Sequence, residues 1–170
     1  MLTVISSRVA AMADDNIVAD LPRGADIIVN TDEFTRRNLV KVGYQANPLE
    51  DDSLDSWHVH SLPLTSITVE ALADFDLTRK EKERAKNMFA LGLLTWLYTR
   101  PAEHTLNLLD ARFAASPKLR DSNKAAFLAG HAYGETTESF AVRYEVGAAP
   151  VPAGTYRQVS GNKALALGLM

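Results

Sequence analysis

Two histidines in the string WHVH are the residues whose types and spacing first suggest chemistry. His58 and His60 would point to one face of a β-strand, because side chains alternate along a strand, and two imidazoles on one face could begin a metal site. Zinc sites need further ligands, but His104 and His131 occur far along the chain in helical segments, and no carboxylate has a ligand-like spacing to the pair. We therefore predict no metal site, and interpret WHVH as a half-exposed strand face.

The string GHAYGETTESF, residues 130–140, is the most unusual polar motif. Its two carboxylates, Glu135 and Glu138, could in principle carry out acid–base chemistry. No histidine or lysine adjoins them, and threonines near a helix end commonly bond the local backbone. Local capping and an inter-domain contact are therefore the favoured interpretation, and we predict no catalytic residue here.

Several common catalytic and binding motifs are absent from these 170 residues. There is no cysteine, which excludes disulfides, thiolate catalysis and cysteine ligands for an iron–sulfur cluster within this sequence. There is no G-x-S-x-G elbow, and neither glycine-rich phosphate motif occurs. The turn after the first expected strand reads SSRVAAM, so the usual mode of dinucleotide binding is not expected.

Three polar residues follow the apolar run ADIIVN, which has the length of a buried strand. Asn30, Thr31 and Asp32 would stand at the carboxyl end of this strand, the edge at which open parallel sheets bind ligands. One interpretation is contact with a ligand or a neighbouring domain. The other is that Thr31 or Asp32 simply caps the helix expected to run through Leu39.

The surrounding pattern predicts an α/β fold with a mostly parallel sheet, followed by several helices. Strand, helix, four-residue turn and strand follow one another at the start, which is typical of a parallel unit. The strands are expected at 2–6, 25–30 and 57–63, and the helices at 7–21, 31–39, 64–75, 78–100 and 117–133.

Local signals support the long helical part. Thr78 and Glu81 have the spacing of a capping box, and Ser116 before Pro117 marks another helix start. Gly92 lies inside an apolar helix, where it costs about 1 kcal/mol relative to alanine, so close approach of another backbone is expected there. The charged turn predicts ion pairs between residues 81 and 84 and between 83 and 86.

The composition is that of an ordinary globular protein, with 46% hydrophobic and 23% charged residues and a net charge of −3. This charge gives no attraction for nucleic acid or for a membrane surface. The N-terminus does not have the pattern of a signal peptide, and the most apolar run, residues 88–98, is too short to span a bilayer. A reducing cytoplasm fits the absence of cysteine.

The last part of the sequence predicts a possible edge strand, FAVRYEV, a Pro/Ala/Gly linker and a short apolar helix capped by Ser160. The helix, 162–170, carries several leucines but has no closing signal of its own. A short apolar helix is marginal in water unless it packs on another surface. Exposed leucines here therefore predict docking or self-association.

Four strings in order resemble the α subunit of the 2-oxoacid:ferredoxin oxidoreductases, most closely the 2-oxoglutarate type. They are DLPRGADIIVNTDEFTRRNL, ERAKNMFALGLLTWLYTRP, AGHAYGETTESFAVRYEV and PAGTYRQVSGNKALALGLM. The resemblance extends from about Leu2 to Met170 and is weakest at the N-terminus and around 45–56.

The resemblance implies a domain layout. Residues 1–140 would form a Rossmann-like γ-type domain that is incomplete at its N-terminus, because the family's opening strand and glycine-rich turn have no counterpart upstream. Residues 141–159 would be a linker, and residues 160–170 the first helix of an absent thiamine-diphosphate-fold domain.

The resemblance also implies a function within a complex. The full enzyme would oxidatively decarboxylate 2-oxoglutarate to succinyl-CoA in the cytoplasm, using thiamine diphosphate, magnesium, an iron–sulfur cluster and coenzyme A. Its partners would be a thiamine-binding β subunit and ferredoxin. This chain alone would bind none of these cofactors and be inactive, serving as active-site cover and subunit interface, with Asn30, Thr31 and Asp32 contacting coenzyme A.

Two other interpretations are open from the sequence. The chain could be a free-standing α/β module that binds a ligand or another protein without catalysis. It could also be a remnant of a broken gene, which would expose an unpaired sheet edge and be poorly soluble.

Overall fold

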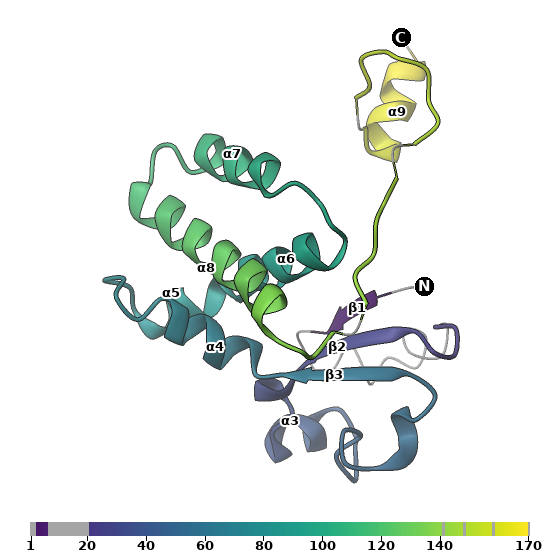
Figure 1. The fold of residues 1–170 in the computed structure, drawn as a ribbon, viewed down its shortest axis with the longest axis vertical. Helices are drawn as coiled ribbons and strands as arrows, with labels where there is room; N and C mark the ends of the chain where they lie inside the picture. Colours follow the sequence, from purple (N-terminus) through teal and green to yellow (C-terminus); the bar gives the residue numbers. More distant parts are fainter. Residues whose placement is uncertain (1–2, 7–20, 141, 148, 158, 170) are drawn as a thin grey trace.

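The computed structural model describes residues 3–6, 21–140, 142–147, 149–157 and 159–169. Within these residues a sheet of three parallel strands carries helices on both sides (Figure 1). This confirms the mixed α/β class and all three expected strands. The strands are β1 (Thr3–Ser6), β2 (Asp26–Asn30) and β3 (His58–Leu62), in that spatial order.

Strand β2 is the centre of the sheet, because it pairs with both other strands. Asp26 lies opposite Thr3 on one side and His58 on the other. All five residues of β2 are buried, as expected for a parallel strand covered on both faces. Ile28 belongs to one apolar cluster, whereas Ile27 and Val29 belong to another, since side chains alternate between the faces.

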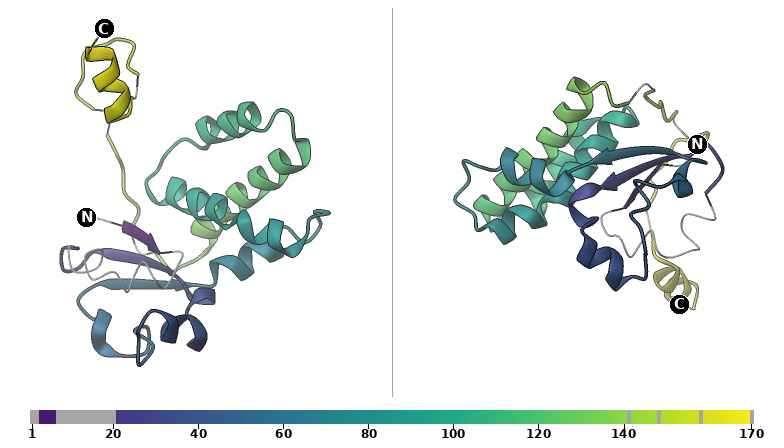
Figure 2. Two further views of the ribbon diagram at one scale, coloured as in Figure 1. Left: turned by 180° about the vertical axis from the view of Figure 1, so that it is seen from behind. Right: turned by 90° about the horizontal axis from the view of Figure 1, so that it is seen from below.

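The helical elements are unevenly distributed around this sheet. The short α3 lies on one side, and the larger group formed by α6, α7 and α8 lies on the other (Figure 2). Among the described helices none is long and apolar enough to cross a bilayer. The elements are η1 (Thr31–Glu33), α3 (Arg36–Lys41), η2 (Asp52–Leu54), α4 (Leu64–Ala71), α5 (Arg79–Arg84), α6 (Lys86–Leu97), α7 (Ala102–Arg112), α8 (Pro117–Thr136) and α9 (Gly161–Gly168).

Helices α6 and α8 pack backbone against backbone. A Cβ placed on Gly92 of α6 would lie 1.9 Å from the carbonyl oxygen of Phe127, and one on Gly130 of α8 would lie 1.9 Å from that of Phe89. Both phenylalanines are fully buried. The close approach expected at Gly92 is confirmed, and a second glycine on the partner helix makes the contact reciprocal.

Several local predictions are confirmed. Thr78 and Glu81 form the capping box of α5, with both reciprocal hydrogen bonds present. Helix α8 begins at Pro117, as expected. Ser160 caps α9 by accepting from the Lys163 N–H at 3.4 Å. The helix expected over 7–21 lies mostly outside the described residues.

Other helical predictions are wrong in their limits. The helix expected over 64–75 ends at Ala71, and the one expected over 78–100 is two helices separated at the buried Ala85. Helix α7 contains His104, which was expected in a helical segment, but no limits were predicted for this helix. Its sequence has a weak apolar pattern, because Leu109 is its one fully buried residue while Leu108 is exposed.

The ion pairs expected in the charged turn are replaced by others. Glu83 pairs with Arg79 at 3.0 Å, and Lys86 reaches Glu33 at 2.8 Å, while the Glu81 carboxylate bonds Thr78. The tertiary fold brings Glu33 within reach of Lys86, which spacing within one helix could not show.

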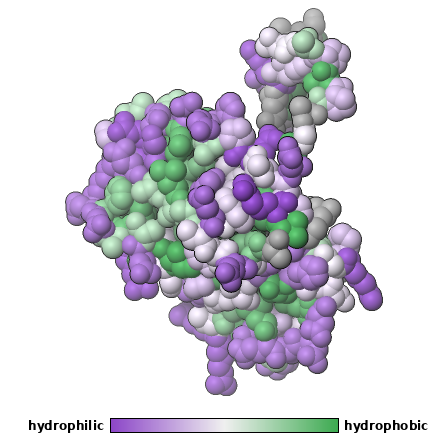
Figure 3. All heavy atoms as spheres, in the orientation of Figure 1, coloured by the Kyte–Doolittle hydropathy of each residue, from purple (hydrophilic) through white to green (hydrophobic). Residues whose placement is uncertain are grey.

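The region after α8 also differs from expectation. The described part of FAVRYEV forms no strand, because its backbone bonds the end of α6 instead: the Tyr144 N–H donates to the Leu97 carbonyl at 2.7 Å. The described residues from 145 onward are all exposed. They lead to α9, which stands apart from the rest with apolar side chains at its surface (Figure 3).

Candidate functional site

The three residues predicted for ligand contact meet the start of helix α4. Asn30 ends β2 and is fully buried. Its Nδ2 donates to Thr65 Oγ1 at 3.0 Å, and its Oδ1 accepts from the Thr65 N–H at 3.4 Å. Thr65 is the second residue of α4, where backbone N–H groups have no partner within the helix. Asn30 therefore fixes the start of α4 against the end of the central strand.

Asp32 acts on the next residue of the same helix. Its Oδ2 accepts from the Ser66 N–H and its Oδ1 from the Ser66 hydroxyl, both at 2.8 Å. Pro63, at the N-cap position, supplies no side-chain bond. A carboxylate from η1 thus caps a helix more than thirty residues away, and its charge complements the positive helix end. A phosphate would have to displace Asp32 to reach these donors.

Thr31 opens η1 and is half-buried. The interpretation that Thr31 or Asp32 caps the following helix is wrong. Helix α3 begins only at Arg36, and Thr35 caps it by accepting from the Asn38 N–H at 3.4 Å. The short 3₁₀ turn separates the strand end from α3, which directs Asp32 to α4 instead. Contact of Asn30, Thr31 and Asp32 with coenzyme A stays a prediction.

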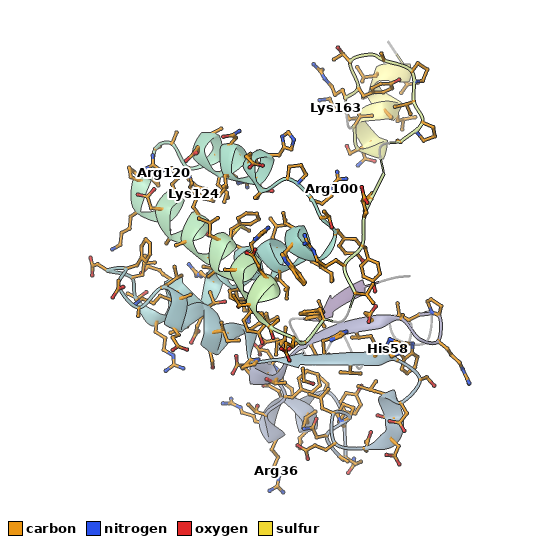
Figure 4. The ribbon with its side chains drawn as sticks, in the orientation of Figure 1. Arg36, His58, Arg100, Arg120, Lys124 and Lys163 are labelled. Carbon is orange, nitrogen blue, oxygen red and sulfur yellow. The ribbon has the colours of Figure 1, made fainter. Side chains whose placement is uncertain are left out.

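A second polar cluster lies near the opposite end of the strands and was not found from the sequence. Asp26 Oδ1 lies 3.1 Å from His60 Nε2 and 3.5 Å from His58 Nδ1. Figure 4 shows His58 on the sheet near the start of β3. The histidines share a face, as expected, and the register of β2 against β3 places Asp26 beside them. Spacing in the sequence could not predict that Asp26 lies beside the histidines, because Asp26 comes from a different strand.

The two imidazoles differ in exposure. The His58 side chain is 67% exposed and that of His60 only 18%. His60 is covered by Phe140, whose ring stacks on it with a centroid distance of 4.6 Å. The nitrogens that face Asp26 are Nδ1 of His58 and Nε2 of His60, and each donates to the carboxylate only when it carries a proton. If His60 Nε2 carries the proton, the carboxylate orients a neutral imidazole.

Tyr144 completes the cluster from far along the chain. Its hydroxyl donates to Asp26 Oδ2 at 2.8 Å. Burial, followed by the hydrogen bond to Asp26, raises the pKa of Tyr144 to about 12, since both effects disfavour the phenolate. The phenol therefore remains a donor throughout the neutral range, and both oxygens of Asp26 have partners within the chain.

A cavity of about 340 Å³ lies at this cluster. Its walls come from the sheet, the end of α6 and the segment after α8, and include Asp26, His58, His60, Phe140 and Tyr144. In the part of the chain that the structure describes, no group of three His, Cys, Asp or Glu side chains could hold a metal ion. The arrangement is suited to holding the segment after α8 on the sheet.

The polar motif at the end of α8 forms mainly local bonds. The Thr136 hydroxyl donates to the Ala132 carbonyl at 2.9 Å, and the Ser139 N–H donates to Thr137 Oγ1 at 3.3 Å. Glu135 and Glu138 are exposed. The interpretation of this motif as local capping is confirmed, and its inter-domain role stays a prediction.

Most of the sequence matches a known protein family. A family model described as "Pyruvate ferredoxin/flavodoxin oxidoreductase" matches residues 3–133. The chain belongs to this family. The match confirms the resemblance to this family and covers the first two of the four sequence strings and the start of the third. It also spans Asn30, Asp32, Asp26 and both histidines of the second cluster, but not Tyr144.

One curated protein of similar sequence is a named oxidoreductase subunit. The 2-oxoglutarate oxidoreductase subunit KorA of Mycobacterium tuberculosis is 48% identical over 153 residues. These residues make up 90% of this chain and 23% of the relative. The chain thus spans about a quarter of the length of the curated relative it matches. No solved structure matches the chain.

Proposed function

We propose that this chain serves as part of the α subunit of a 2-oxoglutarate:ferredoxin oxidoreductase. The observation that carries the proposal is its 48% identity over 153 residues to a protein named as a 2-oxoglutarate oxidoreductase subunit. The assembled enzyme would convert 2-oxoglutarate and coenzyme A to succinyl-CoA and carbon dioxide in the cytoplasm. The two electrons released would pass to ferredoxin.

The catalytic groups of such an enzyme do not fit these residues. An iron–sulfur cluster is generally held by cysteine thiolates, and the 170 residues contain no cysteine. Among the described residues no group of three His, Cys, Asp or Glu side chains could hold a metal ion, although magnesium bound to a phosphate needs only one or two carboxylates. We therefore assign the thiamine diphosphate, magnesium and cluster sites to other parts of the complex, including a thiamine-binding β subunit.

The proposed share of this chain is structural. Residues 1–140 would form the γ-type domain that covers the active site and contacts other subunits. Residues 141–159 would link it to a thiamine-diphosphate-fold domain whose first helix is 160–170. The exposure of Leu165 and Leu167 on α9 and of Leu169 directly after it supports this layout, since an apolar helix of that kind is stable when a neighbouring surface covers it.

The proposed contact with coenzyme A lies at the carboxyl edge of β2. Asn30 is buried and would act by fixing α4, whereas Thr31 and Asp32 are partly exposed. Because Asp32 is acidic and already caps α4, it would accept from an amide or hydroxyl of the ligand and not hold its phosphates.

A chimera tests the proposed function. The stretch of the relative subunit that matches this chain would be replaced by the present sequence, and the hybrid co-expressed with the thiamine-binding β subunit. We expect the hybrid to assemble and to reduce a viologen dye in the presence of 2-oxoglutarate and coenzyme A. The isolated 170-residue chain should give no turnover under the same conditions.

Two results would contradict the proposal. One is a folded hybrid that fails to bind the β subunit. The other is turnover of 2-oxoglutarate by the isolated chain. Tight binding of an unrelated ligand by the isolated chain, together with failure of the hybrid, would favour a free-standing binding module instead.

The same hybrid tests the coenzyme A contact. Thr31→Val and Asp32→Asn should each raise the KM for coenzyme A several-fold while leaving the KM for 2-oxoglutarate unchanged. Asp51→Asn, on the exposed turn before η2, is the matched control. Equal KM values for coenzyme A in all variants would exclude this edge.

A further inference from the structure

The residues that follow α8 hold to the end of α6 and to the sheet through several separate contacts. We call residue 140 with residues 142–144 the strap. The last carbonyls of a helix have no partner within the helix. At the end of α6 the Trp96 carbonyl already accepts from the Thr99 N–H at 3.0 Å, and the strap contacts this carbonyl and that of Leu97. The Tyr144 N–H donates to the Leu97 carbonyl at 2.7 Å, and Arg143 Nε donates to that of Trp96 at 3.3 Å.

Aromatic contacts strengthen the same attachment. The guanidinium of Arg143 lies 4.8 Å from the centre of the Trp96 ring, an arrangement that attracts the cation to the ring face. The Tyr144 ring lies 5.4 Å from that of Tyr98. A cation at a helix C-terminus also complements the helix dipole. Residues 98–100 close most of the end of α6 themselves, because the Thr99 N–H donates to the Trp96 carbonyl and the Arg100 N–H to that of Thr95. The strap adds the bond to Leu97 and a second donor at Trp96.

The strap at the same time covers the polar cluster on the sheet. Phe140 stacks on His60, and the Tyr144 hydroxyl bonds Asp26. These contacts lie at the two ends of the strap, so lifting either end would open the cavity of about 340 Å³ beneath it.

The strap lies between two exposed segments. Before it, Glu138 and Ser139 are exposed, and Ser139 bonds Thr137 two residues earlier. After it, every described residue from 145 to 169 is exposed. Val142, in its middle, is also 56% exposed. The strap is attached by the side chains of Phe140, Arg143 and Tyr144 together with one backbone bond, from Tyr144 to Leu97.

We propose that the strap opens and closes as one unit, coupling access to the Asp26–His58–His60 cluster to the direction in which the segment after Tyr144 leaves the domain. Closed, it shields His60 and fixes the exit of that segment beside β2. Open, it exposes His60 and releases Arg143 from Trp96. The proposal rests on contacts within this chain and is independent of the proposed enzymatic activity.

The test removes the Tyr144 hydroxyl and measures the reactivity of two other residues, His60 and Arg143. In Tyr144→Phe, the bond to Asp26 is lost. We expect carbethoxylation of His60 by diethyl pyrocarbonate and tryptic cleavage after Arg143 to rise together, by about tenfold, as a charge-assisted bond of ordinary strength implies. Mass spectrometry measures both rates.

Internal references separate strap opening from unfolding. His58 is already exposed and should react equally in both proteins, as should the half-buried His131 of α8. Cleavage after the exposed Arg157 should also stay constant. The matched control is Tyr156→Phe, which removes a hydroxyl that donates to the Pro152 carbonyl in the exposed segment; it should change neither the His60 rate nor the Arg143 rate.

A second variant provides an independent measurement. Phe140→Leu keeps an apolar side chain but removes the ring that stacks on His60, and it should raise cleavage after Arg143 although residue 143 is untouched. If either variant changes its own neighbour alone, or neither rate changes, the strap does not move as a unit and the proposal is wrong. If the reaction at His131 rises as well, opening is global and the proposal is equally wrong.

Discussion

Asp26 illustrates how much of this structure depends on single side chains. It is buried at the start of the central strand, yet it contacts two histidines of β3 and the hydroxyl of Tyr144. A buried carboxylate is stable only when donors surround it. The cluster therefore joins three separate parts of the sequence around one charge.

Titration of Tyr144 should reveal its hydrogen bond to Asp26. Its folded pKa is raised from 10.0 to about 12, so its contribution to stability is complete below pH 10 and is lost as the pH rises through about 12. We expect the absorbance difference at 295 nm between the wild type and Tyr144→Phe to titrate near pH 12. A difference that titrates near pH 10 would show that the phenol is not bonded to Asp26.

The two glycines of the α6–α8 contact should not tolerate alanine. In Gly92→Ala and Gly130→Ala the added methyl group would meet a main-chain carbonyl at 1.9 Å, so the helices must separate. We expect each substitution to lower the free energy of unfolding by about 3 kcal/mol, measured by urea denaturation. Gly168→Ala, where the methyl group meets nothing within 4 Å, should leave it unchanged.

At the scale of elements, helix α4 depends on side chains outside itself. Its own N-cap position is a proline without a capping side chain, and Asn30 and Asp32 supply the missing bonds from the end of β2 and from η1. The strand and the helix therefore form one unit, although a turn of 3₁₀ helix, α3, η2 and β3 separate them in the sequence.

Removing these external caps should weaken the fold in a definite order. Asn30→Ala leaves two partly buried groups of Thr65 without their partner and should lower the free energy of unfolding by about 2 kcal/mol. Asp32→Ala, at a partly exposed cap, should lower it by about 1 kcal/mol. Chemical denaturation measures both, with Asp74→Ala at an exposed acid as the control for charge. A larger effect for Asp32 than for Asn30 would contradict this assignment.

Features that depend on residues close together in the sequence were predicted better than features that depend on contacts between distant residues. The strands, the capping box at Thr78 and the start of α8 at Pro117 were predictable, because their signals lie within a few residues. The limits of α7 were not predicted, because its apolar pattern is weak. The Asp26 cluster could not be predicted, because the strand register and the course of the chain after α8 bring Asp26, His60 and Tyr144 together.

At the scale of the whole molecule, the chain divides into a packed part and an exposed one. The packed part contains the sheet and α3 to α8, and the strap closes it. The remainder, including α9, has no buried residue among those described. Leu165, Leu167 and Leu169 are more than half exposed there, so the apolar surface most available for association lies outside the core.

Replacing two of these leucines should separate association from stability. Leu165→Gln combined with Leu169→Gln should reduce self-association of the isolated chain at high concentration, since less apolar area can be buried between copies. The free energy of unfolding should not change, because both side chains are exposed. Sedimentation velocity measures the first quantity and urea denaturation the second. A wild-type chain that remains monomeric at the same concentrations would contradict the expectation.

The direct backbone contact between α6 and α8 also limits which amino acids can stand at Gly92 and Gly130. Where side chains lie between two helices, a change in one can be absorbed by a neighbour, so many combinations of residues are acceptable. At Gly92 and Gly130 the opposing surface is main chain, which every amino acid presents alike. No second substitution can restore the space, so saturation mutagenesis should find both positions restricted to glycine whatever the surrounding sequence.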